Sequence, residues 1–304
     1  MKILVTGSNG LLGQKLVELI ARRADHELLA TARGDNRLVV QGADFSYQSL
    51  DVTNGDEVES VIGGFRPDVV INTAGMTNVD ECETNHIGCD ALNVLAVEHL
   101  VRVCSAHQIF LLHLSTDFIF DGADGPYFED AVPNPLSYYG HSKLKGEETV
   151  LGASCPWAIA RTVLVYGIAQ NMSRSNIILW VKSSLEQGKT IKVVTDQWRT
   201  PTLAEDLAIG CLLIAEQRAT GIFNISGPDM LTPYEMAIAT ADYFGLDKSL
   251  ITEADSTTFT QAAVRPPKTG FVIDKARITL GYQPHSFNDG IAYLAKQLAD
   301  IRTA

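Results

Sequence analysis

The chain is poor in cysteine and in positive charge, and both shortages exclude classes of protein. Its five cysteines are scattered and include no C-x-x-C pair, so neither a disulfide framework nor a zinc site is expected, and a reducing cytoplasm fits best. The chain has 24 Lys and Arg against 36 Asp and Glu, and this net charge of −12 argues against nucleic-acid binding or a basic membrane patch. An anionic ligand would therefore need local cations.

Long apolar runs and metal-binding motifs are also missing. No apolar stretch approaches the ~18 residues of a membrane helix, and too few apolar residues follow Met1-Lys2 for the core of a signal peptide. The seven histidines show no H-E-x-x-H or comparable spacing, so the sequence indicates no metal site. Whether a divalent ion assists the protein is left open. We expect a cytoplasmic protein with no membrane and no nucleic acid as partner.

What the chain does contain is an alternation of strand and helix patterns. Ile3-Leu4-Val5 is a short apolar run, and leucines and Ile20 then recur at helical spacing from Leu11. Further strands are expected at 26–32, 46–50, 68–72, 109–115, 157–162 and 222–225, and a helix at 86–107. This alternation predicts an α/β fold, a Rossmann-type doubly wound parallel sheet with right-handed crossovers.

A glycine-rich turn follows the first strand directly. It reads Gly7-Ser8-Asn9-Gly10-Leu11-Leu12-Gly13. The first glycine permits a tight turn, the second lets the backbone approach a pyrophosphate, and the third allows close packing of helix and strand. We therefore expect Gly7, Asn9, Gly10, Leu11, Leu12 and Gly13 to bind a dinucleotide. The alternative is a glycine-rich turn of another α/β protein.

The residue after the second strand distinguishes the two nicotinamide cofactors. An acidic residue there would bind the ribose 2′-hydroxyl, but the chain has Arg33, which favours a 2′-phosphate and hence NADPH over NADH. A solvated arginine is the alternative, which Asp35 keeps open. Asp51 and Val52, after the third strand, are expected beside the adenine.

Tyr139 and Lys143 are four residues apart and so lie on one face of a helix. A nearby ammonium would lower the pKa of Tyr139 and let the phenol donate a proton near neutral pH. Thr116, after Ser115 at the end of the fifth strand, could hold a substrate carbonyl. An ordinary surface tyrosine and lysine are the alternative.

The fourth strand ends in small residues, Asn72-Thr73-Ala74-Gly75, which would let a nicotinamide approach the edge of the sheet. For Asn93 we favour a structural role near the site.

From Gly227 onward the alternation of strands and helices loosens. We therefore expect an NADP-binding domain at 1–162 and 203–226 and a smaller substrate-binding lobe at 163–202 and 227–304. Capping boxes are expected to begin helices at 202–205 and 232–235.

Together these motifs resemble the extended short-chain dehydrogenase/reductase family, which has the glycine turn, a Ser or Thr after the fifth strand, and Tyr-x-x-x-Lys. Within it, the chain is most similar to the dTDP-4-dehydrorhamnose reductases. The matching stretches are 72–80, 115–122, 139–147, 161–167, 196–202 and 265–269, so the resemblance covers nearly the whole chain.

The resemblance implies an NADPH-dependent reduction of the C4 ketone of dTDP-4-dehydro-L-rhamnose to dTDP-L-rhamnose, with Thr116, Tyr139 and Lys143 as catalytic residues. Tyr139 would donate the proton, Lys143 would lower its pKa and hold the nicotinamide ribose, and Thr116 would bind the carbonyl oxygen. Further cofactor contacts are expected from Ala74, Gly75, Thr77 and Asn93. Substrate contacts are expected from Thr116, Asp117, Val165, Asn171 and Arg265. For Arg265, a salt bridge between the lobes is an equal alternative.

Met76, Val163 and Trp198 depart from the family pattern, so the identity of the sugar in the substrate is left open. Two other functions therefore stay open. One is a reductase or epimerase of another nucleotide sugar. The other is a non-catalytic, NADP-binding regulatory subunit related to the beta subunit of methionine adenosyltransferase, which the retained Thr116, Tyr139 and Lys143 disfavour. A homodimer is the assembly that the resemblance suggests.

Overall fold

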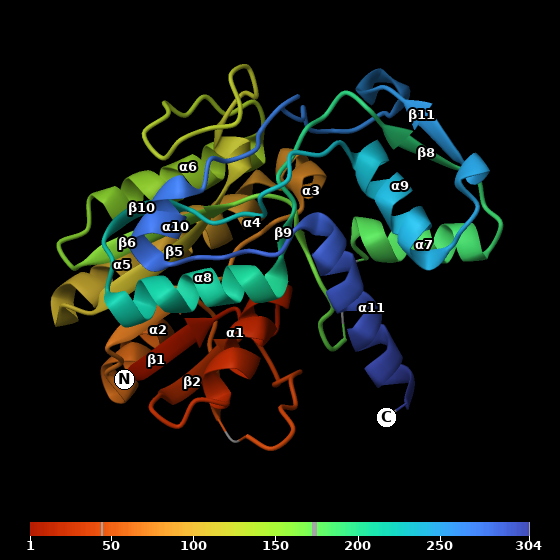
Figure 1. The fold of residues 1–304 in the computed structure, drawn as a ribbon. Coiled ribbons are helices and arrows are strands. Elements are labelled where there is room, and N and C mark those ends of the chain that lie inside the picture. The colour runs from red at the N-terminus through yellow and green to blue at the C-terminus, as the bar shows by residue number, and fades with distance from the viewer. Residues whose placement is uncertain (44, 172–174, 304) are drawn as a thin grey trace.

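The computed structural model describes residues 1–43, 45–171 and 175–303. At its centre lies a sheet of seven strands in the order β10-β6-β5-β4-β1-β2-β3 (Figure 1). The strands are β1 (Lys2–Thr6), β2 (Glu27–Ala32), β3 (Ser46–Ser49), β4 (Val69–Asn72), β5 (Phe110–Thr116), β6 (Trp157–Thr162) and β10 (Gly221–Asn224). Every neighbouring pair is parallel. The predicted doubly wound α/β fold is therefore confirmed.

The strand order reverses at β1, which lies between β4 and β2. Thr6, its last residue, pairs with Thr31 on one side and with Asn72 on the other. The connections that leave β1 and β4 therefore diverge, and in doubly wound folds ligands bind at the carboxyl ends of the strands beside such a reversal. This edge of the sheet also receives the ends of β2 and β5.

Helices cover both faces of the sheet. On one face α1 (Leu11–Ala21), α8 (Ala204–Gln217) and α10 (Asp274–Leu280) contribute to an apolar core that also contains Ile3 and Val5. On the other face α2 (Gly55–Phe65), α5 (Ala96–His107) and α6 (Tyr138–Leu151) pack against Leu4. Because successive side chains point to opposite faces and both faces are buried, the central strands are uninterrupted apolar runs.

A smaller group of elements lies beside the sheet, at the upper right of Figure 1. It contains α7 (Ile177–Glu186), β8 (Ile191–Val194), α9 (Pro233–Phe244) and β11 (Ile251–Ala254), and β8 pairs with β11. These elements share an apolar cluster of their own, which includes Val181, Ile191 and Ala237. Helix α11 (Phe287–Thr303) joins an adjoining cluster through Phe287, Ile291 and Leu294.

Short elements complete the fold. They are α3 (Val79–Thr84), α4 (His86–Asp90), the π-helical turn η1 (Ala91–Leu95), the 3₁₀ turns η2 (Asp117–Ile119), η3 (Lys248–Leu250) and η4 (Ser256–Thr258), and the paired strands β7 (Val165–Tyr166) and β9 (Thr202–Leu203). The single helix expected at 86–107 is thus α4, η1 and α5 in sequence. Within the described ranges, no helix has both the length and the apolar character that a membrane span requires.

The two predicted capping boxes have different outcomes. At α9 the hydroxyl of Thr232 accepts from the amide of Glu235 at 3.1 Å, and the Glu235 carboxylate accepts from the Thr232 amide in return, so that prediction is confirmed. At α8 the prediction is wrong. Leu203 is the N-cap residue, and the hydroxyl of Thr202 instead donates to the carbonyl oxygen of Val163 at 2.7 Å, because Thr202 belongs to β9.

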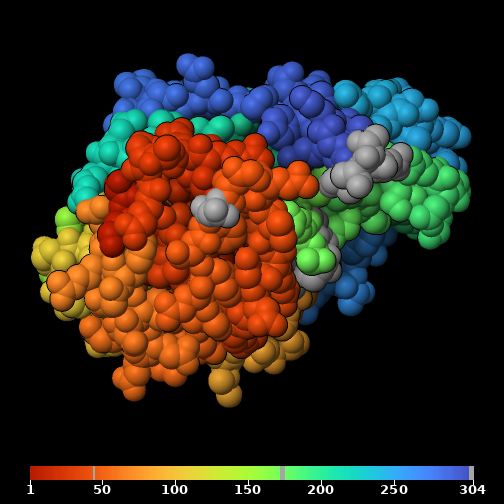
Figure 2. Space-filling view, turned by 90° about the horizontal axis from the view of Figure 1, so that it is seen from below, coloured from red at the N-terminus to blue at the C-terminus, as the bar shows by residue number. Residues whose placement is uncertain are grey.

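The segment from Phe271 to Tyr282 packs differently from the rest of 227–304. Phe271, Ile273, Ala276, Leu280 and Tyr282 contribute to the core beneath α1 and α8. This stretch therefore lies on the sheet, and the expected smaller lobe would be formed from the remaining elements. Seen from below, the N-terminal segment in red and orange occupies one side of the molecule, and green and light-blue segments form the other (Figure 2).

Candidate active site

The glycine turn between β1 and α1 forms a bare backbone cradle at the carboxyl edge of the sheet. A Cβ atom at Gly7 would lie 2.8 Å from the amide nitrogen of Ala74, and one at Gly13 would lie 2.3 Å from the carbonyl oxygen of Gly7. Gly10 precedes the first residue of α1 and provides no side-chain cap, so the first amides of this helix keep their hydrogen-bonding capacity. Such a cradle fits the pyrophosphate of a dinucleotide.

Asn9 ties the glycine turn to the loop after β2. Its Nδ2 donates to the carbonyl oxygen of Asp35 at 2.9 Å, and its Oδ1 accepts from the amide of Arg37 at 2.9 Å. Arg33 and Arg37 are both exposed on this loop. Sequence reasoning selected Arg33 and missed Arg37, although a second arginine in the same loop was a readable signal. Two guanidinium groups beside the turn suit a 2′-phosphate.

Asp51 and Val52 follow β3, but the side chain of Asp51 forms hydrogen bonds whereas that of Val52 lies in the apolar core. The carboxylate of Asp51 accepts from the amide and the hydroxyl of Thr53, at 3.0 and 2.7 Å, and the bond from this hydroxyl lowers the pKa of Asp51. The side chain of Val52 is buried in the core between α2 and α5. The Val52 side chain therefore serves packing, which leaves its backbone as the part that an adenine could contact.

Thr116, Tyr139 and Lys143 come together at the carboxyl end of β5. Thr116 ends the strand, whereas Tyr139 and Lys143 lie one turn apart on α6. All three are buried, with exposed fractions of 7%, 7% and 6%. The Thr116 hydroxyl lies near enough to the Tyr139 phenol to influence its pKa. The phenol ring also packs edge-on against Phe118, with 5.7 Å between the ring centroids. The three predicted catalytic residues are thus neighbours in the structure.

The pKa of Tyr139 is shifted opposite to the predicted direction. Burial raises it, the nearby Thr116 hydroxyl lowers it in part, and the negative charge of Asp117 raises it further. The prediction relied on the ammonium of Lys143. In the structure, the Nζ atom of Lys143 donates to the carbonyl oxygen of Leu114 at 2.6 Å. The predicted direction is therefore wrong for this arrangement, because the amino group is directed at β5.

A chain of buried polar groups leads from β1 to this lysine. The hydroxyl of Thr6 donates to Oδ1 of Asn72 at 2.6 Å, and Nδ2 of Asn72 lies 3.0 Å from Nδ1 of His113. On the other side of the imidazole, Nε2 lies 3.4 Å from Nζ of Lys143. Burial lowers the pKa of Lys143 to about 8. Sequence reasoning missed His113, because alternation alone does not show which strand histidine faces α6.

Asn93 supports the loop after β4. Its Oδ1 accepts from the amide of Met76 at 2.8 Å, and its Nδ2 donates to the carbonyl oxygen of Met76 at 3.0 Å and to the hydroxyl of Ser142 at 2.9 Å. Asn93 thereby links this loop to α6. Ala74 and Gly75 are partly buried and Thr77 is exposed at the same edge of the sheet. The favoured structural role of Asn93 agrees with these contacts.

The expected substrate residues are less closely grouped. Arg265 forms a bidentate pair with Asp80, with NH1–Oδ1 and NH2–Oδ2 distances of 3.2 and 2.7 Å, as the salt-bridge alternative anticipated. Asn171 follows Gln170, whose amide donates to Oε1 of Gln14 on α1 at 2.7 Å. Asn171 therefore lies on the side of the glycine turn. Val165 is partly buried in β7.

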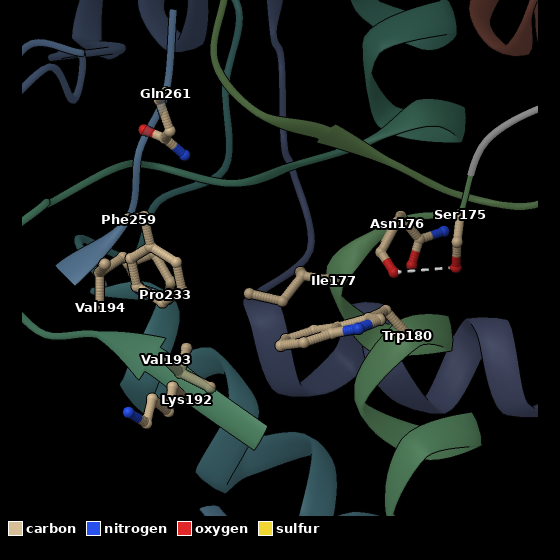
Figure 3. A pocket seen from close by; sticks show the side chains of 10 residues that line it. All are labelled: Ser175, Asn176, Ile177, Trp180, Lys192, Val193, Val194, Pro233, Phe259 and Gln261. Carbon is tan, nitrogen blue, oxygen red and sulfur yellow. Dashed lines mark hydrogen bonds between the residues drawn. The ribbon is translucent and has the colours of Figure 1, made fainter. Parts of the chain in front are cut away.

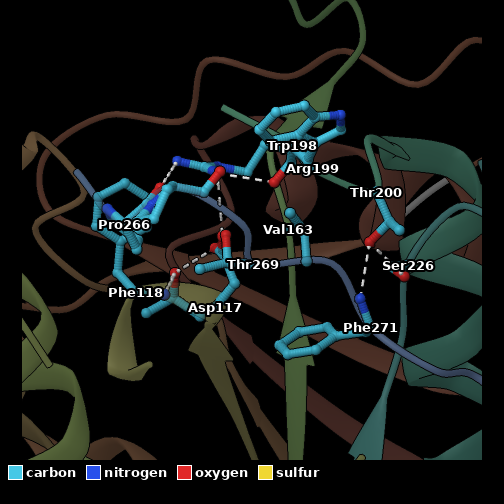
Figure 4. Close-up of polar contacts among 12 residues, drawn as sticks. Asp117, Phe118, Val163, Trp198, Arg199, Thr200, Ser226, Pro266, Thr269 and Phe271 are labelled. Atoms are coloured by element: carbon cyan, nitrogen blue, oxygen red, sulfur yellow. Dashed lines mark hydrogen bonds and ion pairs between the residues drawn. The ribbon is translucent and has the colours of Figure 1, made fainter. Parts of the chain in front are cut away.

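The carboxylate of Asp117 is enclosed by protein groups (Figure 4). It accepts from the hydroxyls of Thr116 and Thr269, and Nε of Arg199 lies 3.8 Å from Oδ2. Asp117 and Arg199 are only 2% and 5% exposed. Asp117 was expected to contact substrate, but its oxygens are used within the protein.

The three departures from the family pattern also have places in the structure. Met76 packs against the cluster that contains Tyr139. Val163 is fully buried in the apolar core that α1 and α8 cover. Trp198 is 38% exposed, and its amide donates to the carbonyl oxygen of Pro267 at 2.7 Å. Met76 thus adjoins α6, and Trp198 adjoins the 265–269 segment.

A cavity of about 410 Å³ lies within the smaller group of elements (Figure 3). Ile177 and Trp180 on α7, Pro233 on α9, and Phe259 form apolar walls, and Lys192 and Gln261 add polar groups. Trp180 and Phe259 are 40% and 37% exposed. Partly exposed aromatic side chains beside a few polar groups are typical of a small-molecule site.

Comparisons with known proteins agree with this geometry. The protein named "Probable low-salt glycan biosynthesis reductase Agl14" of Haloferax volcanii is 30% identical, over 99% of both chains. The dTDP-4-dehydrorhamnose reductase of Aggregatibacter actinomycetemcomitans is 33% identical, over 93% of this chain and 94% of its own. The methionine adenosyltransferase 2 subunit beta of Xenopus tropicalis is also 33% identical, over 82% of this chain and 73% of its own.

Solved structures show the same fold. A dTDP-4-dehydrorhamnose reductase of Clostridium acetobutylicum superposes with a TM-score of 0.86 at 28% identity, over 98% of this chain and 100% of its own. A dTDP-4-dehydrorhamnose reductase of Bacillus anthracis, in complex with NADP, has a TM-score of 0.83 at 24% identity, over 97% of this chain and 99% of its own. The family model for the RmlD substrate binding domain matches residues 1–300. The family model covers nearly the whole chain, and the solved reductase structure has the same fold. This protein therefore belongs to the RmlD substrate-binding-domain family.

Proposed function

We propose that this protein is a cytoplasmic, NADPH-dependent reductase of the C4 ketone of a nucleotide sugar, with dTDP-4-dehydro-L-rhamnose as substrate. One observation carries the proposal. Thr116, Tyr139 and Lys143 are buried together at the carboxyl end of β5, on the sheet edge that also carries the uncapped glycine turn. The reductase relatives, which match almost the whole chain, support the same reaction class.

NADPH, when bound, supplies the hydride that reduces the C4 carbon. The amides that begin α1 would hold its pyrophosphate, and Arg33 and Arg37 would hold its 2′-phosphate. Lys143 would turn from Leu114 toward the nicotinamide ribose. The glycine turn carries no side chain at Gly10, and the first amides of α1 have no side-chain cap, so the residues present fit such a cofactor.

Tyr139 would donate the proton that completes the alcohol at O4. Because burial raises its pKa, the phenol is protonated at neutral pH, as a general acid must be before the reaction. The proton moves from the phenol to O4 as the C4 carbon is reduced, and the ketone becomes a secondary alcohol. The Lys143 ammonium would then favour the phenolate that remains.

The cavity among α7, β8 and α9 would take the nucleoside part of the substrate. Trp180 and Phe259 would contact the base through their aromatic faces, which suits a flat pyrimidine. Residues 163–202 and 227–304, without the stretch 271–282, would then form the substrate-binding lobe. The domain at 1–162 and 203–226 would hold the cofactor.

The first experiment follows NADPH oxidation with dTDP-4-dehydro-L-rhamnose. In Tyr139→Phe we expect kcat to fall by about 10²–10⁴-fold with NADPH binding retained. Tyr138→Phe is the matched control, because this neighbouring tyrosine stacks on His86 and donates to Asp90 at 2.8 Å. The proposal fails if Tyr139→Phe turns over as fast as wild type.

A second function, a non-catalytic regulatory subunit, is favoured by the methionine adenosyltransferase subunit beta relative at 33% identity. It predicts that NADPH binds, that no nucleotide sugar is reduced, and that the protein raises or lowers the activity of a methionine adenosyltransferase catalytic subunit. Turnover lost only in Tyr139→Phe would decide for the reductase. Tight NADPH binding without turnover of any 4-keto nucleotide sugar would decide against it.

A further inference from the structure

The loop between β2 and β3 carries the two arginines that would bind the 2′-phosphate, and different neighbours hold them. Near Arg33, the hydroxyl of Tyr47 on β3 lies 3.1 and 2.6 Å from the carbonyl oxygens of Ala32 and Gly34. The backbone on both sides of Arg33 is therefore attached to the sheet. Arg37 comes later in the same loop, where other groups hold the backbone.

Asn9 and Gln170 are the groups that hold the backbone around Arg37. The amide of Arg37 itself donates to Oδ1 of Asn9 at 2.9 Å. The amide of Val39 donates to Oε1 of Gln170 at 3.2 Å, and Nε2 of Gln170 donates to the carbonyl oxygen of Val39 at 2.9 Å. The side-chain amide of Gln170 thus pairs with both backbone groups of Val39, and Arg37 lies between the two attachments.

The residues next to Val39 show what this pair adds to the loop. Leu38 and Val40 are buried in the core that α1 covers, whereas the side chain of Val39 is 72% exposed. Packing therefore attaches the loop to the core, and Gln170 attaches the backbone between the two buried side chains to the segment after β7.

Gln170 is itself anchored on α1. Its amide donates to Oε1 of Gln14 at 2.7 Å, and Nε2 of Gln14 donates to the carbonyl oxygen of Gln170 at 2.9 Å. Gln14 is fully buried, and its Nε2 also donates to the carbonyl oxygen of Asn9 at 3.1 Å. The backbone of Gln170 therefore has a fixed place beside the glycine turn. Its side chain reaches from the expected substrate-binding lobe to Val39, 131 residues away along the chain.

We propose that Gln170 is a positioning residue for cofactor selectivity, which holds the loop at Val39 so that the guanidinium of Arg37 can bind the 2′-phosphate of NADPH. This inference rests on the cofactor part of the proposed function and adds a residue of the other lobe to it. Gln170 acts through Arg37 and does not itself bind the cofactor. NADH has a hydroxyl in place of the 2′-phosphate, so its binding does not depend on Gln170.

The first test compares the binding of NADPH and of NADH by fluorescence titration. Gln170→Met keeps the length of the side chain and removes both hydrogen bonds to Val39, and the exposed position should leave the fold intact. We expect the Kd for NADPH to rise by about fivefold and the Kd for NADH to stay unchanged. Gln187→Met is the control, because this exposed glutamine donates to the hydroxyl of Ser183 on α7 at 3.0 Å.

Double variants test whether Gln170 acts through Arg37. In the Arg37→Ala background, Gln170→Met should weaken NADPH binding no further, because the group that it positions is already missing. In the Arg33→Ala background the same change should still weaken binding by about fivefold, since Tyr47 holds the backbone around Arg33. A residue that only stabilised the fold would show the same effect in both backgrounds.

The outcomes separate this inference from the rest of the proposed function, because the titration needs no sugar substrate. A selective loss of NADPH affinity that disappears in the Arg37→Ala background supports the inference even without turnover. No loss, equal losses for NADPH and NADH, or an undiminished loss in that background would overturn it. Tight NADPH binding without turnover in the wild type would count against the reductase alone. A wild type that binds no NADPH would overturn both the cofactor assignment and this inference.

Discussion

His113 in the middle of β5 and Lys143 on α6 face each other, with Nε2 of the imidazole 3.4 Å from the Nζ atom and both side chains buried. The other ring nitrogen of His113 lies 3.0 Å from Nδ2 of Asn72. Oδ1 of Asn72 accepts from the Thr6 hydroxyl and from the amide of Ala74, which fixes the orientation of this amide group. The Asn72 amide therefore donates to Nδ1, which leaves Nε2 as the ring nitrogen that faces Lys143.

This relationship predicts the protonation state of His113. Burial lowers its pKa well below 6.5, and the charge of Lys143 lowers it further. We expect a neutral imidazole from about pH 6 to pH 8. Nitrogen NMR of the labelled protein, with His113→Gln to assign the signals, measures this directly. A His113 signal that titrates within this range would contradict the prediction.

Lys143 should make stability depend on pH in the protein without cofactor. Burial lowers its pKa from 10.5 to about 8, so folding releases a proton between these values. The free energy of unfolding contributed by this group therefore rises with pH from about 8 to about 10.5. In urea denaturation, Lys143→Met should gain most over wild type below pH 8 and lose that advantage by about pH 10.

The exposed Lys145 lies on the same helix and provides the control for this series. Lys145→Met should differ from wild type by an amount that does not change with pH. If Lys143→Met behaves in the same way, the amino group of Lys143 does not have the environment described above.

Glu147 and Arg161 form a buried ion pair that should be costly to break. The Nε–Oε1 and NH2–Oε2 distances are 3.0 and 2.7 Å, and the side chains are 1% and 3% exposed. Glu147→Gln leaves a buried guanidinium without its partner charge, so we expect a loss of about 3–5 kcal/mol in the free energy of unfolding. The exposed Lys2–Glu27 pair is the comparison, and Glu27→Gln should cost about 0–1 kcal/mol.

Gly13 should not tolerate a side chain. The Cβ atom of Gly13→Ala would lie 2.3 Å from the carbonyl oxygen of Gly7, so the glycine turn must shift. We expect a loss of stability and at least a tenfold weaker binding of NADPH in a fluorescence titration. Gly63→Ala is the control, since its Cβ would meet only Glu59 at 3.8 Å within α2, and it should stabilise by about 0.5–1 kcal/mol.

Arg33 and Arg37 should determine the preference between cofactors. If both guanidinium groups contact the 2′-phosphate, Arg33→Ala and Arg37→Ala each raise the KM for NADPH by about tenfold and leave the KM for NADH unchanged. Steady-state kinetics with both cofactors test this. An equal change in the two KM values would show that these side chains support the loop instead, as Tyr47 does by donating to Gly34 at 2.6 Å.

Much of the site follows from local patterns in the chain. The strand ends at Thr6, Asn72 and Thr116 are near their expected positions because continuous apolar runs stop there, and parallel strands bring these ends to one edge. The four-residue spacing of Tyr139 and Lys143 places them on one face of α6. The capping box of α9 is equally local, since Thr232 and Glu235 interact within one turn.

The sequence by itself therefore determined the fold class, the order of the strands along the chain and the helix that carries Tyr139 and Lys143, because these depend on periodicity over a few residues. Only the tertiary structure decided that Lys143 turns to Leu114 and His113, that Asp117 pairs with Arg199, and that Arg265 is held by Asp80. Each of these contacts joins groups brought together by the packing of separate elements. Their energies depend on burial and on the neighbouring charges, which only the folded chain brings together.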